Sequence, residues 1–333
     1  FTEISYCKPA QKQVFINAHG ILPKGGGDLI DLHCDTLSKL VNSAYSLARN
    51  PFHFDIQRAL KAGLTTQFLA LFSHKPDDNA VLRAILQQIA CFGANLSKTA
   101  RACLIAVHED LEKARVEGQL GIILHLEGAD ALGKDPGLWP LFHLLGVRSL
   151  GLTWNYNNAF AGGVLDPEPV GLSTAGRCLL AEMQQVGSIL DLAHVGELSF
   201  YQALDCYSAA VMVSHANARS LCEHPRNLTD HQIQSLAEHK GIIGVNLVAD
   251  FVDASNPDIE RLIDHIVHIC SLVGVEHVAL GSDFDGADNL LLSDVAEYPM
   301  LAARLEGRGF TAHDIQAILH DNAAGFLEQV FAP

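Results

Sequence analysis

The stretch Leu29-Ile30-Asp31-Leu32-His33-Cys34-Asp35 is a short apolar run that ends in a histidine and a carboxylate. Apolar runs of this length, bounded by Gly, Asn, Asp or His and separated by longer segments of helical periodicity, are typical of parallel βα units. Seven further runs follow the same pattern. The eight predicted strands are 29–33, 65–71, 122–126, 147–153, 188–193, 210–214, 242–246 and 277–281. A ninth run, 104–107, is expected either to pair at an edge or to displace one of the eight.

Segments with helical periodicity lie between these runs, each long enough to cross back over a sheet. They include 79–101, 173–185, 230–239 and 259–273. Eight strands with intervening helices predict an α/β fold, a (β/α)8 barrel of the TIM type. The alternative, a doubly wound open sheet, requires a glycine-rich phosphate turn after an early strand. The nearest candidate, Lys24-Gly25-Gly26-Gly27, precedes the first strand instead.

The chain has 333 residues, a length that a single α/β barrel commonly reaches. Its composition, 49% hydrophobic and 18% charged, supports a sizeable buried core. No internal repeat or proline-rich linker divides it, although 162–171 reads as a loop. We therefore expect one domain, residues 28–333, with residues 1–27 as an appended amino-terminal segment.

A formal net charge of -16 and the lack of a lysine and arginine cluster argue against nucleic-acid binding. The eight cysteines form no Cys-x-x-Cys pair, and most have apolar neighbours, which fits a reducing compartment. Neither 1–27 nor 325–333 holds an apolar run suited to a signal peptide or an anchor, although the chain begins at Phe1 rather than Met. We therefore expect a cytoplasmic protein without a membrane partner.

Chemistry-bearing side chains recur where the predicted strands end. In a parallel barrel the loops after the strands share one face, so these side chains should converge there. They are His33, Asp35, Glu127, His194, His215 and Asp283. Each one alone has an ordinary explanation, such as a hydrogen-bonded core histidine or a loop-capping carboxylate. Together, imidazoles and carboxylates at successive strand ends predict a site for zinc or another borderline divalent ion. Other histidines, among them His74 and His143, are expected to be surface or packing residues.

Six separated motifs also occur in the order that a known family has them. The chain resembles the membrane (renal) dipeptidase family, peptidase family M19 of the amidohydrolase superfamily, and looks like its bacterial branch. The resemblance covers about residues 28–330. The motifs are Asp31-Leu32-His33-Cys34-Asp35-Thr36, His125-Leu126-Glu127-Gly128, Asp191-Leu192-Ala193-His194-Val195, Ser214-His215-Ala216, Arg226-Asn227 and Gly281-Ser282-Asp283-Phe284-Asp285-Gly286.

The resemblance implies two zinc ions per chain, one held by His33 and Asp35 and the other by His194 and His215. Glu127 would bridge the two ions. Two cations lower the pKa of a shared water, so a bridging hydroxide can act as the nucleophile at neutral pH. Asp283 would lie beside this hydroxide, accept its proton and return it to the leaving amine.

Substrate binding is expected at two further places. In the family, the arginine that matches Arg226 binds the terminal carboxylate of the substrate, a task suited to the guanidinium fork. Where mammalian members have an oxyanion-stabilising histidine after Leu-Thr, this chain has Trp154. The Trp154 indole and the amides of Asn155 and Asn158 are therefore the candidate donors to the oxyanion.

These observations together predict a zinc-dependent dipeptidase. Its substrates would be small dipeptides, including those with a D-residue at the carboxyl end, as the family implies. Two alternatives stay open: another amidohydrolase reaction, such as deacylation of N-acyl amino acids, or a catalytically silent metal-binding scaffold. The partner is a small dipeptide, and a homodimer is common in the family.

Overall fold

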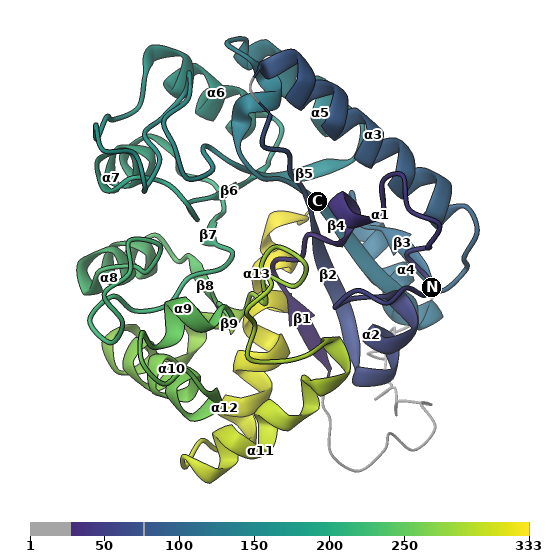
Figure 1. Cartoon of the computed structure of the whole chain (residues 1–333), viewed down its shortest axis with the longest axis vertical. Helices are drawn as coiled ribbons and strands as arrows, with labels where there is room; N and C mark the ends of the chain where they lie inside the picture. Colours follow the sequence, from purple (N-terminus) through teal and green to yellow (C-terminus); the bar gives the residue numbers. More distant parts are fainter. Residues whose placement is uncertain (1–27, 76, 333) are drawn as a thin grey trace, which may run out of the picture.

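The computed structural model describes residues 28–75 and 77–332. Nine parallel strands form one sheet in the order β2-β1-β9-β8-β7-β6-β5-β4-β3. Because β2 also pairs with β4, eight strands close into a ring surrounded by helices (Figure 1). The strands are β1 Leu29–Asp31, β2 Leu64–Leu71, β3 Ala102–Leu104, β4 Leu120–Leu126, β5 Val147–Gly151, β6 Ile189–Asp191, β7 Val211–Val213, β8 Ile242–Val245 and β9 Val278–Leu280. The fold is therefore the predicted (β/α)8 barrel.

The helices include all four segments of predicted helical periodicity. The first of these ends at Leu96 rather than at residue 101, because the chain must turn before it enters β3. The helices are α1 Thr36–Leu40, α2 Ile56–Ala62, α3 Asp78–Leu96, α4 His108–Glu117, α5 Trp139–Leu144, α6 Thr174–Gln185, α7 Glu197–Cys206, α8 Asp230–Glu238, α9 Ala249–Val252, α10 Ile259–Val273, α11 Pro299–Gly307, α12 Ala312–Gln316 and α13 Asn322–Val330.

The ninth apolar run, predicted at 104–107, forms β3 at Ala102–Leu104 and displaces no strand of the ring. β3 pairs with the first half of β4, where Ala102 lies opposite Leu120. β5 pairs with the second half, where Leu124 lies opposite Val147. The single long strand β4 thus accommodates two neighbours on one side, and β3 lies at the edge.

Most side chains inside the barrel are apolar, although the strands also carry buried polar residues such as Gln67 and His125. Inward-facing residues such as Ile30, Phe68, Ile123 and Met212 form one buried cluster with Phe326 of α13. A second, larger cluster fills the space between the strands and the surrounding helices. Since both layers are mostly apolar, most polar groups of the ring lie toward the ends of the strands.

Two glycines allow the strand ends of β7, β8 and β9 to approach closely. A Cβ atom at Gly244 would lie 2.0 Å from the Ser214 carbonyl oxygen, and one at Gly281 would lie 1.9 Å from the same atom. No side chain fits at such distances, so both positions require glycine. The close approach brings the segment after β7 next to the segment after β9.

None of the described helices is both long and apolar enough to cross a membrane. The cysteines of the described residues, Cys34, Cys91, Cys103, Cys178, Cys206, Cys222 and Cys270, are free thiols. The appended segment 1–27 lies outside the described residues, so its separation from the barrel stays a prediction.

Candidate metal centre

The loop after β1 supplies His33 and Asp35, whose side chains turn toward each other. His33 Nε2 lies 3.1 Å from Asp35 Oδ2, 3.7 Å from Glu127 Oε1 and 4.0 Å from Asp283 Oδ1. Cys34, between the two ligand candidates, packs into the apolar layer instead. This is the alternation expected from an extended chain. Three carboxylates, which follow β1, β4 and β9, thus lie around one imidazole nitrogen.

His194 follows β6 and His215 follows β7, and both face Glu127. The Nε2 atoms of the two histidines are 2.9 Å apart. Glu127 Oε1 lies 3.0 Å from His194 Nε2 and 3.9 Å from His215 Nε2. Since the same oxygen also faces His33, Glu127 lies between the two halves of the cluster.

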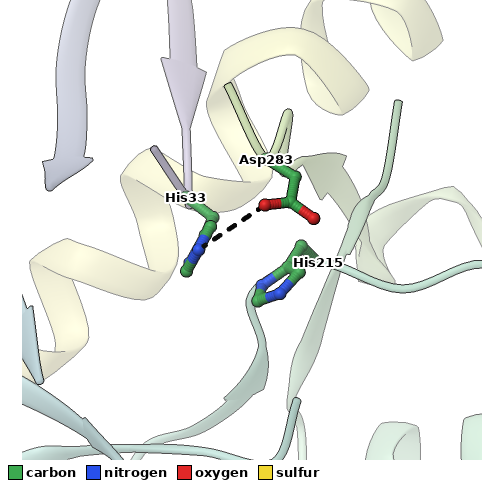
Figure 2. Close-up of side chains that lie close together, drawn as sticks. All are labelled: His33, His215 and Asp283. Carbon is green, nitrogen blue, oxygen red and sulfur yellow. Dashed lines mark ion pairs between the residues drawn. The ribbon is translucent and has the colours of Figure 1, made fainter. Parts of the chain in front are cut away.

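The six side chains predicted from the strand ends are therefore close together. They form three overlapping groups in which the ligand atoms of each group lie within 4.8 Å of one another. Figure 2 shows one group, in which His33, His215 and Asp283 point toward a common centre from three different segments. All six side chains belong to residues that are at most 9% exposed.

The hydrogen bonds of His194 and His215 fix which ring nitrogen carries the proton. His194 Nδ1 lies 2.7 Å from Asn155 Oδ1, an oxygen that can only accept. His215 Nδ1 lies 2.8 Å from Ser214 Oγ, whose own hydrogen is donated to Asp191. Both Nδ1 atoms are therefore donors, and both Nε2 atoms direct a lone pair toward the same place. Two facing lone pairs at 2.9 Å repel each other unless a cation lies beside them.

Burial and charge shift the pKa values of the cluster strongly. Burial raises the pKa of Glu127 and of Asp283, and repulsion from the Asp35 carboxylate adds to both effects. Burial lowers the pKa of His194 and His215, helped by Arg226 and His33, so that both rings stay neutral. Burial alone would also lower the pKa of His33, but Glu127 and Asp35 outweigh it and raise the value to about 10.

The donor set fits a pair of divalent cations. Three carboxylates, Asp35, Glu127 and Asp283, are buried beside Arg226 and His33, so negative charge is in excess even when His33 is protonated. Such an excess of buried negative charge is costly unless cations compensate it. Among the described residues, His33 Nδ1 and Asp35 Oδ1 are also buried without a hydrogen-bond partner. Mixed imidazole and carboxylate ligands suit zinc and similar ions.

Two aspartate–serine pairs hold the segments that carry the cluster. Asp31, at the end of β1, accepts hydrogen bonds from the Ser282 amide at 2.8 Å and the Ser282 hydroxyl at 2.7 Å. Asp191, at the end of β6, accepts from the Ser214 amide at 2.9 Å and from its hydroxyl. Each pair joins the end of one strand to the segment that follows the neighbouring strand of the ring. The serine of each pair directly precedes Asp283 or His215 in the sequence. The sequence motifs include these residues, but the sequence alone predicts no role for them.

Backbone conformation adds to this positioning. His194 has φ 64° and Asp283 has φ 63°. Non-glycine residues rarely adopt the left-handed region, and those that do concentrate at functional sites. Both residues lie three positions after the end of a strand, so the turn aims their side chains into the cluster.

Arg226 lies beside the histidine half of the cluster. It is buried, and its Nη2 donates to the His215 carbonyl oxygen at 3.1 Å. Its guanidinium carbon is 5.6 Å from the centre of the Phe251 ring. Arg226 and His194 line a cavity of about 190 Å³, in which the arginine can reach a bound anion.

Trp154 lines a second cavity, of about 160 Å³, together with Glu127. Its indole packs against Phe72 at 5.2 Å and His74 at 5.1 Å between ring centres. His74, expected from the sequence to be a surface or packing residue, is exposed and also lines this cavity. Its position in the loop after β2 is the sequence signal that could predict a place beside the site.

Asn155 and Asn158 have different surroundings. Asn155 holds His194, as described above, and so contributes to the cluster through its amide oxygen. Asn158 donates to the Leu152 carbonyl oxygen at 2.9 Å and to Asp130 Oδ2 at 3.2 Å. Its oxygen accepts from two backbone amides of the same loop. Both hydrogens of the Asn158 amide are engaged, so we do not retain this residue as a substrate donor.

Several of the curated proteins to which the chain is similar are named dipeptidases. The uncharacterized dipeptidase C3A11.10c of Schizosaccharomyces pombe is 30% identical over 336 residues, 94% of this chain and 82% of that protein. Dipeptidase tcpJ of Claviceps purpurea is 32% identical over 228 residues, 67% of this chain. The match spans about half of that relative, 54% of its length, and 52% of dipeptidase aclJ of Aspergillus oryzae.

Solved structures show the same barrel. A metallo peptidase from Rhodobacter sphaeroides, liganded with a phosphinate mimic of the dipeptide L-Ala-D-Ala, has a TM-score of 0.86 at 25% identity. The similarity covers 92% of this chain and 99% of that one. The family model described as membrane dipeptidase (peptidase family M19) matches residues 26–331. The chain therefore belongs to the membrane dipeptidase family, peptidase family M19.

Proposed function

We propose that the chain is a dipeptidase that binds two zinc ions and hydrolyses the amide bond of small dipeptides. Membership of the family implies a metal cofactor. The observation that carries the proposal is the position of Glu127 Oε1 between the pair His33 and Asp35 and the pair His194 and His215. Each half offers ligands to one ion, and Glu127 can serve both.

When bound, two zinc ions lower the pKa of a water molecule and polarise the scissile carbonyl. Asp283 would take a proton from that water. Asn246 Nδ2 donates to Asp283 Oδ2 at 3.1 Å, which leaves Oδ1 directed toward His33. Burial raises the pKa of Asp283, which makes its carboxylate a better base at neutral pH. The proton then passes from Asp283 to the leaving amine.

Arg226 would bind the carboxylate of the substrate's last residue, because a guanidinium pairs with a carboxylate through two parallel hydrogen bonds. We include dipeptides with a D-residue at the carboxyl end among the substrates. The Rhodobacter sphaeroides metallo peptidase, which is similar over nearly the whole barrel, was solved with a mimic of L-Ala-D-Ala, and this supports the choice. Trp154 lines the space on the other side of Glu127, where the first residue would lie.

A substrate panel tests this function. The zinc-loaded chain is assayed with L-Ala-D-Ala, L-Ala-L-Ala and N-acetyl-D-Ala, with release of the free amino acid as the measurement. We expect turnover of the dipeptides and little of the acylated compound. Turnover of the acylated compound alone would instead indicate an N-acyl amino acid deacylase, and no turnover of any would indicate a silent scaffold.

A further inference from the structure

The cavity beside Glu127 is separate from the cavity that contains Arg226. Glu127, Gly128, Asp130, Trp154 and Tyr156 line the first, while His194 and Arg226 line the second. The buried cluster lies between them, because Glu127 contacts both His33 and His194. A dipeptide with its carboxylate at Arg226 and its amide at the cluster would therefore extend its first residue into the cavity beside Glu127.

Asp130 is the acidic group in this cavity that the proposed reaction does not use. It belongs to the short 3-10 turn Ala129–Leu132, three residues after Glu127. A Cβ atom at Gly128 would lie 3.0 Å from Asp130 Oδ2 and 3.1 Å from the Trp154 amide nitrogen. Gly128 therefore lets the Asp130 carboxylate and the Trp154 backbone approach each other at the wall of the cavity that Glu127 also lines.

Among the described residues, no lysine, arginine or histidine lies within ion-pair distance of Asp130, although the charge of His74 nearby acts on it. Asn158, a neutral amide, is the one described side chain that donates to it, at 3.2 Å. Partial burial raises the pKa of the Asp130 carboxyl group, so its charge is costly without a cation. A ligand that supplies a positive charge would relieve this cost.

The aromatic wall of the cavity suits the same kind of ligand. The rings of Trp154 and Tyr156 are 6.1 Å apart and both line the cavity. An ammonium group is attracted to the face of an indole ring as well as to a carboxylate. Lys75 lines the cavity from the loop after β2, and its positive charge disfavours a cation on that side and favours one beside Asp130.

We propose that Asp130 binds the α-ammonium group of the substrate's first residue and thereby selects free dipeptides over N-acylated amino acids. The inference rests on the proposed dipeptidase function and assigns its specificity to one residue. Asp130 and Arg226 would then hold the two charged ends of a dipeptide, on either side of the cluster. An N-acyl amino acid lacks the ammonium group and would forfeit one of the two anchors.

The test compares Asp130→Asn with the unaltered chain on two substrates that differ only in the amino group, L-Ala-D-Ala and propionyl-D-Ala. Asparagine has the same size and can still accept the hydrogen bond from Asn158. A hydrogen bond to a charged group contributes about 1.5–3 kcal/mol, so kcat/KM for L-Ala-D-Ala should fall roughly 10- to 100-fold, mainly through KM. The kcat/KM for propionyl-D-Ala should change by no more than about twofold, since this substrate has no ammonium group to contact Asp130.

The matched control is Asp78→Asn. Asp78 is exposed and its charge acts on Asp130, but it does not line the cavity. The Asp78→Asn replacement should leave the ratio of the kcat/KM values for the two substrates unchanged. A binding measurement accompanies the assay: the phosphinate mimic of L-Ala-D-Ala should lose affinity for Asp130→Asn, and its analogue without the amino group should not.

The outcomes separate the two proposals. If the unaltered chain hydrolyses neither substrate, the proposed function fails. If it hydrolyses L-Ala-D-Ala but Asp130→Asn keeps the same preference, or loses both substrates equally, the assignment of Asp130 is overturned while the dipeptidase function stands.

Discussion

His194 and His215 face each other through their Nε2 atoms at 2.9 Å, and neither atom carries a proton that could join them. Asn155 and Ser214 impose this state, since each accepts the Nδ1 proton of one ring. The arrangement is costly by itself and becomes favourable when both nitrogens bind a cation. The positions of Asn155 and Ser214 are therefore as informative about the metal centre as the ligands themselves.

Replacing Asn155 by alanine should weaken metal binding at the histidine half of the cluster. Without the amide oxygen, His194 is free to rotate and to change tautomer. Loss of such a partner typically costs 10- to 100-fold in metal affinity, and we expect about this loss for one of the two ions. Competition with a chromophoric chelator measures it.

Asn157→Ala is the control for this variant. Asn157 lies in the same loop, but its amide bonds to Glu168 and Gly163 rather than to a ligand candidate. Equal metal affinity of Asn155→Ala and the unaltered chain would show that Asn155 does not orient His194.

Replacing Arg226 by lysine should raise KM for dipeptides by roughly 10- to 100-fold, because an ammonium cannot form the paired hydrogen bonds of a guanidinium. Dipeptide amides, which lack the terminal carboxylate, should show little change. Arg219→Lys serves as the comparison, since Arg219 lines the same cavity but donates to the Asn227 and Pro225 carbonyl oxygens. An equal effect of Arg226→Lys on acids and amides would contradict carboxylate binding.

Replacing Asp283 by asparagine should reduce kcat by about 10²- to 10⁴-fold, the usual contribution of a positioned acid–base group. Asn246 can still donate to the new amide oxygen, so the loop should keep its shape. The zinc content should stay near that of the unaltered chain, measured by elemental analysis of the desalted protein. Activity that survives the replacement would remove Asp283 from the proposed role.

The sequence predicts the barrel and the six clustered side chains because both depend on local patterns. An apolar run followed by a polar residue marks a strand end, and parallel strands bring all such ends to one face. Asp31 and Ser282, in contrast, are 251 positions apart, and their hydrogen bond exists only because β1 and β9 are neighbours in the closed ring. The sequence likewise does not reveal that Asp130 lines a cavity, because that cavity exists only once the loop containing Trp154 packs beside Gly128.

Two differences between the prediction from the sequence and the structure have the same cause. The position of Asn158 after Leu152 and Thr153 predicts an oxyanion donor, whereas in the structure its amide nitrogen donates to the Leu152 carbonyl oxygen and to Asp130. Its partner Asp130 comes from another loop, so no local pattern in the sequence could reveal the contact. β3 begins two residues and ends three residues earlier than predicted, because its register against β4, rather than its apolar content, sets its bounds.

His143 gives a pH dependence that is independent of the metal centre. Burial on α5, with the neighbouring Arg148, lowers its pKa to about 4 from 6.5. Between these values the unfolded chain binds more protons than the folded one, so the free energy of unfolding falls as the pH drops from 6.5 to 4. In His143→Gln the melting temperature should fall less steeply over this range, whereas His313→Gln, an exposed replacement, should behave like the unaltered chain. Identical slopes for all three proteins would refute this contribution.

The claim of a two-ion dipeptidase is tested most directly by titrating the chelator-treated chain with zinc while recording bound metal and hydrolysis of L-Ala-D-Ala at each step. The account predicts saturation at two ions per chain, with activity rising as the second ion binds. Full activity in the metal-free chain, or saturation at a single ion with full activity, would contradict it.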